Sequence, residues 1–110
     1  MPNKTLAHLT KVEAQFTAWL KSNHTGKANP VIARSMRQWG TGPQIRKLVH
    51  QLRVKGVPIC STNRGYFYAK TDVEVETAVK FLTSYMNEIS VARQGLLYSY
   101  VNVHDRLQPV

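Results

Sequence analysis

Lysine and arginine side chains gather in one stretch of this chain that contains no acid. Between Glu13 and Asp72 the sequence has neither Asp nor Glu, and ten of its fifteen Lys and Arg residues lie there. The net charge is +9 and the pI is near 10.1. A field of one sign, unrelieved by acids, attracts and holds a polyanion. We therefore predict nucleic acid as the leading partner, ahead of an anionic membrane surface.

Side chains that catalyse reactions or bind metals show no suitable spacing. His24, His50, His104 and Cys60 do not have the spacing of metal ligands, and no pair of catalytic carboxylates is recognisable. One cysteine excludes an internal disulfide and fits a reducing compartment. No secretion signal and no transmembrane helix are expected. We expect a protein that is not an enzyme and that uses no metal or cofactor.

The periodicity of apolar residues predicts an α+β fold that is mainly helical. Steps of three and four indicate helices, and two β-rich runs around Asn63-Arg64-Gly65 indicate a hairpin. The expected elements are helices over 9–21, 30–40 and 42–55, strands over 57–62 and 66–70, and a long helix from Thr71. The division that follows is a domain over 1–70 and a C-terminal helix over 71–110.

Two of these helices have clear local signals at their ends. Pro30 suits the first position of the helix over 30–40, and Gly40 suits its end. Thr41 and Gln44 have capping-box spacing at the start of the helix over 42–55. A short helix, a tight turn and a second helix make a helix-turn-helix.

The segment from Gly42 to Ile59, GPQIRKLVHQLRVKGVPI, followed by Ser61 and Gly65-Tyr66, resembles the DNA-binding domain of biotin-operon repressors. It is also similar to small winged-helix proteins of bacteriophages and prophages. The resemblance implies a winged helix-turn-helix with three N-terminal helices and a two-stranded wing. It implies DNA binding, in transcription or replication control, in the cytoplasm of a bacterial host cell. It does not extend to a ligase domain, so no ligase activity is implied.

The helix over 42–55 is the expected recognition helix in the major groove. Bidentate Arg to guanine and Gln to adenine are common base contacts, and Gln44, Arg46 and Lys47 lie near its N-terminal end. The alternative is a solvated basic face, or one that contacts phosphates only. His50 is equally suited to a base contact and to a surface position.

Other cations are expected to hold the DNA backbone. Arg64 at the wing tip, beside Asn63, suits the minor groove or a phosphate, although an ordinary hairpin turn is the alternative. Arg34 and Arg37 suit phosphates. The residues expected to contact DNA are Arg34, Arg37, Thr41, Gln44, Arg46, Lys47, His50, Arg53, Asn63, Arg64 and Lys70.

The long helix carries an apolar ladder in steps of four and three. We expect its first half to pack on the preceding domain and its second half to pair with a second copy, although Arg93 within the ladder weakens a parallel coiled coil. The residues expected at a homodimer interface are Met86, Ile89, Leu96 and Tyr100. Two competing functions remain open: a phage module that binds a host polymerase or nuclease, and RNA binding.

Overall fold

The computed structural model describes residues 8–107, and their side chains as far as Tyr100. It is an α+β structure, mostly helical, with one two-stranded antiparallel sheet. Residue contacts divide the chain into one unit up to Ala78 and a second from Val79. The boundary therefore falls inside the last helix, eight residues beyond the division at 70/71 that the sequence suggested.

Helix α2, Lys11–Asn23, begins with a reciprocal capping box. The Thr10 hydroxyl accepts from the Glu13 N–H, and a Glu13 carboxylate oxygen accepts from the Thr10 N–H at 2.8 Å. Phe16 and Leu20 on its inner face are fully buried. This cap starts the helix with two backbone N–H groups satisfied.

The helix expected over 30–40 does not form. Two single 3-10 turns, η1 (Ala33–Ser35) and η2 (Arg37–Trp39), occupy this segment. The N–H and C=O of Val31 both bond to Tyr66 at 2.8 Å, which commits Val31 to an extended, strand-like backbone. Because this pairing removes the first helical residues, only short turns fit before Gly40. Of the three N-terminal α-helices expected over 9–55, the described residues form two, and two 3-10 turns lie between them.

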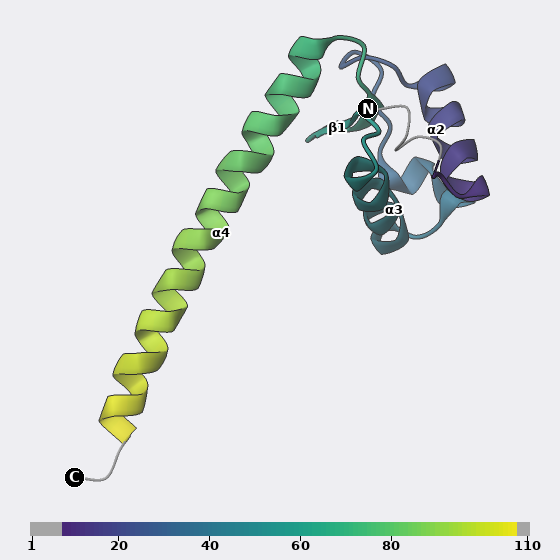
Figure 1. Cartoon of the computed structure of the whole chain (residues 1–110). Coiled ribbons are helices and arrows are strands. Elements are labelled where there is room, and N and C mark those ends of the chain that lie inside the picture. The colour runs from purple at the N-terminus through teal and green to yellow at the C-terminus, as the bar shows by residue number, and fades with distance from the viewer. Residues whose placement is uncertain (1–7, 108–110) are drawn as a thin grey trace. The chain divides into compact units, whose positions relative to one another are not determined.

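Helix α3, Gly42–Val54, follows the expected pattern. The Thr41 hydroxyl accepts from the Gln44 N–H, and Gln44 returns a bond to the Thr41 N–H. The buried side chains on its inner face are Ile45, Leu48, Val49 and Leu52. They share one core with Phe16 and Leu20, so α2 and α3 pack around the same apolar cluster (Figure 1).

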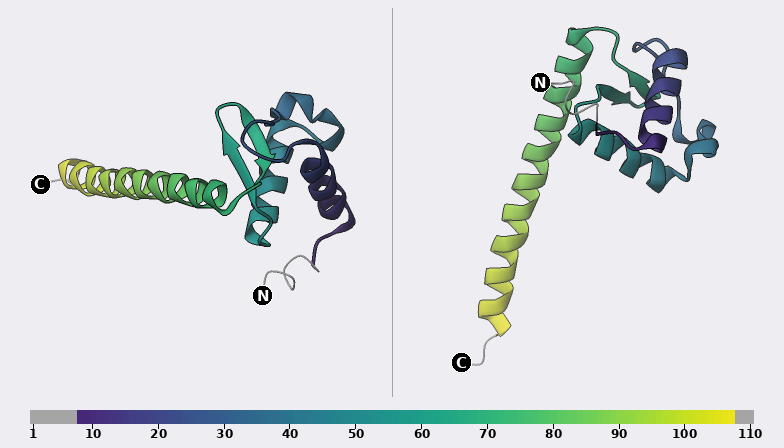
Figure 2. Two further views of the ribbon diagram at one scale, coloured as in Figure 1. Left: turned by 90° about the horizontal axis from the view of Figure 1, so that it is seen from above. Right: turned by 45° about the vertical axis from the view of Figure 1, so that its right-hand side comes forward.

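Strands β1 (Ile59–Thr62) and β2 (Gly65–Tyr68) form the expected hairpin beside α3 (Figure 2). Thr62 pairs with Gly65, which leaves a two-residue turn. On its other edge β2 bonds to the backbone at Val31 and Thr25, so β2 lies between β1 and the loop after α2. Gly65 has a φ of +129° and approaches Val31 so closely that a Cβ would lie 2.3 Å from the Val31 carbonyl oxygen. Only glycine fits there.

Helix α4, Asp72–Leu107, is 36 residues long and confirms the expected C-terminal helix. The Thr71 hydroxyl accepts from the Glu74 N–H at its start. In the second unit every side chain from Val79 to Tyr100 is exposed, including those of the apolar ladder. This unit is thus a single helix whose apolar stripe is open to solvent.

Candidate nucleic-acid interface

An open depression of about 640 Å³ lies at the N-terminal end of α3. Arg34 and Arg37, from the two 3-10 turns, line it together with Thr41, Gly42 and Gln44 from the start of α3. Because both arginines lie on these turns, η1 and η2 bring Arg34 and Arg37 to the first turn of α3. Four residues expected to contact DNA therefore meet at one place.

Arg46 extends toward the same end of α3. One of its guanidinium nitrogens lies 3.7 Å from the position that a Cβ on Gly42 would take. No Asp or Glu lines the depression within the described residues. The N-terminal end of a helix carries a partial positive charge, although at the start of α3 the capping box uses the N–H groups of Thr41 and Gln44 and Pro43 has none. Arg34, Arg37 and Arg46 add three guanidinium groups to that charge, and the combination suits a phosphate.

The outer face of α3 continues this cationic surface. The side chains of Arg46, Lys47 and His50 are exposed and form no hydrogen bond or ion pair with another described residue. Residues three and four apart are neighbours on a helix, so Arg46 and Lys47 both lie next to His50. Their donors are available to a ligand without first breaking an internal bond.

Gln44 and Thr41 are partly occupied by the capping box. The Gln44 side-chain oxygen accepts from the Thr41 N–H at 2.8 Å. A bidentate contact with adenine needs both the oxygen and the NH₂ group of the amide. While the cap is in place Gln44 retains only its NH₂ donor, so it suits a single bond to a base or a phosphate.

The hairpin turn lies next to the segment that leads into η1. Asn63 and Arg64 are exposed at the turn, and Gly65 beside them is held against the backbone of Val31 and Ile32. The backbone N–H of Arg64 donates to the Thr62 hydroxyl at 3.1 Å. The Arg64 guanidinium has no partner among the described residues. The backbone contact at Gly65 thus holds the hairpin turn against the segment just before η1.

Arg53 serves the fold instead of the open surface. Its Nε donates to the Ile59 carbonyl oxygen at 2.7 Å, and a terminal nitrogen donates to the Ser61 hydroxyl at 3.1 Å. Desolvation by burial lowers the pKa of Arg53 below its ordinary value. This arginine joins the C-terminal end of α3 to β1, so a contact with DNA would compete with two internal bonds.

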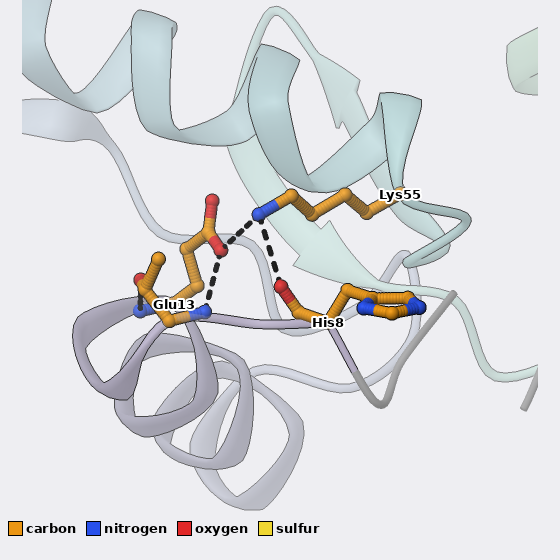
Figure 3. A network of polar contacts seen from close by, with 4 residues as sticks. His8, Glu13 and Lys55 are labelled. Atoms are coloured by element: carbon orange, nitrogen blue, oxygen red, sulfur yellow. Dashed lines mark hydrogen bonds and ion pairs between the residues drawn. The ribbon is translucent and has the colours of Figure 1, made fainter. Parts of the chain in front are cut away.

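Lys55 is also withdrawn from the cationic surface, by the buried carboxylate of Glu13 (Figure 3). Its ammonium lies 2.7 Å from the Glu13 Oε1 and 3.2 Å from the His8 carbonyl oxygen. The hydrogen bond from Lys55, followed by that from the Thr10 N–H, lowers the pKa of Glu13 below its ordinary value. The pair joins the start of α2 to the end of α3. Sequence spacing offered no signal for it, because the partners are 42 residues apart.

Lys70 lies beyond the end of β2 that is opposite the hairpin turn. Its side chain is 3.5 Å from the position of a Cβ on Gly26, in the loop after α2. The N–H groups of Lys70 and Lys27 donate to the Glu74 carboxylate, and these bonds lower the pKa of Glu74. Lys70 is exposed but is next to an acid, unlike the cations around the start of α3.

The four residues expected at a dimer interface lie on α4 in the second unit. Met86, Ile89, Leu96 and Tyr100 are exposed, with fractions between 53% and 72%. Their spacing places them along one stripe, as expected, and pairing with a second copy stays a prediction.

No described helix is long and apolar enough to cross a membrane. Among the residues with described positions, no three His, Cys, Asp or Glu side chains gather as metal ligands. Comparison with protein families, curated proteins and solved structures found no family model, no relative and no structural neighbour that matches the chain.

Proposed function

We propose that this protein binds double-stranded DNA through a winged helix-turn-helix, with α3 in the major groove. One observation carries the proposal: Arg34, Arg37 and Arg46 converge on the N-terminal turn of α3, where no described acid offsets them. Phosphate binding at a helix N-terminus orients a recognition helix on the duplex, and the side chains of that helix then reach base edges.

The order of elements in the first unit supports the same proposal. A helix, two short helical turns, a second helix, a glycine and a hairpin follow one another from α2 to β2. The turns take the place of the first helix of a helix-turn-helix and keep α3 exposed on its outer side. The setting we propose, transcription or replication control in the cytoplasm of a phage-infected or bacterial cell, rests on the resemblance of residues 42–66.

Each group has a distinct role in this proposal. Arg34 and Arg37 bind phosphates and position the protein without reading sequence. Arg46 and Lys47 contact base edges from α3. Arg64, at the wing turn, binds the backbone or the minor groove beside the site. Arg34, Arg37 and Arg64, each neutralising one phosphate, give a log–log salt slope of about −2.7.

Fluorescence anisotropy with duplex DNA, measured over a range of salt concentrations, tests these roles. Changing Arg37→Ala should lower the slope by about one and weaken all sequences alike, whereas Arg46→Ala should also reduce the preference among sequences. Lys70→Ala is the matched control, because Lys70 is an equally exposed cation away from the depression, and it should leave the slope unchanged. Equal losses of DNA affinity in all three variants would mean that the depression is not part of the DNA-binding site.

Competition between nucleic acids tests whether duplex DNA is the preferred ligand. Bound DNA should be displaced by unlabelled duplex DNA at a much lower concentration than by structured RNA of equal length. Equal displacement, or no binding near physiological salt, would refute the proposal, because nonspecific attraction falls steeply as salt rises.

A further inference from the structure

Six apolar side chains of the second unit form a stripe along α4, while others, such as Phe81 and Val91, are exposed outside it. Their steps of four and three match the seam of a two-stranded coiled coil. The stripe comprises Val79, Leu82, Met86, Ile89, Leu96 and Tyr100, with Arg93 between Ile89 and Leu96. Leu82 is 43% exposed and Leu96 72%. A long apolar stripe on an exposed helix is typical of an interface.

We propose that this stripe pairs with the same stripe of a second copy, with the two helices antiparallel. The spacing is self-complementary in that direction. In the register that aligns the two stripes with the greatest overlap, residues 75–107 of the two helices lie side by side. Met86 of one copy then faces Leu96 of the other, and Ile89 faces Arg93. Each ladder position then meets a ladder position, as a two-fold symmetric interface requires.

Arg93 separates the antiparallel from the parallel arrangement. In a parallel pair the two Arg93 side chains share one layer of the seam, where two like charges repel each other and cannot both be well solvated. In the antiparallel pair each Arg93 lies opposite Ile89, so its methylene groups cover an apolar side chain while the guanidinium extends to water. A single polar residue in a seam commonly fixes orientation and register in this way.

The distribution of charge along α4 favours the same direction. Residues 72–88 contain four acids and one base, whereas residues 89–107 contain two bases and one acid. Antiparallel pairing places the acidic half of one helix against the basic half of the other and opposes the helix dipoles. The positions that flank the seam, Thr83, Tyr85, Ser90 and Ala92, are uncharged and give no preference for parallel pairing.

This inference does not depend on DNA binding, although it has a consequence for it. Each first unit is joined to the start of its own α4, so antiparallel pairing puts the two helix starts at opposite ends. With 36 residues per helix, those starts lie roughly 50 Å apart. A dimer would thus attach its two first units at points farther apart than the roughly 34–36 Å that separates adjacent half-sites.

Disulfide cross-linking of the full chain tests the direction. Cys60 is first replaced by alanine, and Met86→Cys and Leu96→Cys are made separately in that background. Each variant is oxidised alone. The two variants are also mixed under reducing conditions, so that subunits exchange, and the mixture is then oxidised. The mixture should give at least tenfold more disulfide dimer than either variant alone. Asn87→Cys mixed with Leu96→Cys is the matched control, because position 87 faces away from the seam, and it should give only background.

The opposite results would overturn the proposal. Efficient cross-linking of Met86→Cys alone and of Leu96→Cys alone means a parallel pair. A mixture without disulfide, or a wild-type monomer by sedimentation at about 100 µM, means that something other than a second copy covers the stripe. In the Met86→Cys background, Arg93→Leu should raise the disulfide yield several-fold, because a parallel pair then no longer places two cations in one layer. An unchanged yield would mean that Arg93 does not determine the direction of pairing.

Discussion

Replacing Lys55 with methionine should destabilise the first unit without weakening its attraction for DNA. The change removes the ammonium from a Glu13 carboxylate whose side chain is 6% exposed, while Lys55 itself is 30% exposed. Breaking a fully buried ion pair costs about 3–5 kcal/mol, and an exposed pair is worth less than about 1 kcal/mol. Because water reaches Lys55 and the Thr10 N–H still binds the carboxylate, we expect a loss of about 2 kcal/mol.

Glu13→Gln is the matched partner for this variant. Glutamine keeps the oxygen that accepts from the Thr10 N–H, so the capping box survives while the charge is lost. The partly exposed Lys55 can then be hydrated, and the expected loss is about 1 kcal/mol. Urea unfolding followed by tryptophan fluorescence measures both, since Trp19 and Trp39 contact the core of the first unit. A double-mutant cycle isolates the pair.

The pH dependence has a definite sign. Bonding to Lys55 lowers the pKa of Glu13 in the folded state, so its contribution is complete above the unfolded pKa and disappears as pH falls through the folded pKa. The stability difference between the native protein and Glu13→Gln should therefore shrink below about pH 4.5, the ordinary value for this carboxyl. A difference that stays constant from pH 7 to pH 3, or a cost below about 0.5 kcal/mol for Lys55→Met, would refute this account.

Two other substitutions test how the hairpin is attached. Gly65→Ala should cost about 3 kcal/mol in urea unfolding, because it combines a positive φ with a Cβ 2.3 Å from the Val31 oxygen; native stability would contradict that close approach. Arg53→Met should cost about 1–2 kcal/mol of stability, because its two bonds to β1 are lost, and it should leave the salt slope of DNA binding unchanged. A slope lowered by about one would mean that Arg53 contacts a phosphate.

The elements whose causes are local could be predicted from the sequence. Thr10 with Glu13, and Thr41 with Gln44, start helices through bonds that span three residues. The apolar steps of α3 and α4 and the two-residue turn of the hairpin are local in the same sense. The exposed cations of α3 followed from the same periodicity, because a helix that buries one face presents the other.

The tertiary structure decided what depends on contacts between distant residues. Val31 pairs with Tyr66, and this bond replaces the expected helix over 30–40 with the 3-10 turns that carry Arg34 and Arg37 to the start of α3. Residue types in the sequence therefore determined that positive charge is clustered in one part of the chain and that a helix presents some of it on an exposed face. Only folding decided which cations remain available, because a charge is withdrawn when a distant carboxylate or carbonyl meets it inside the fold, as Glu13 meets Lys55.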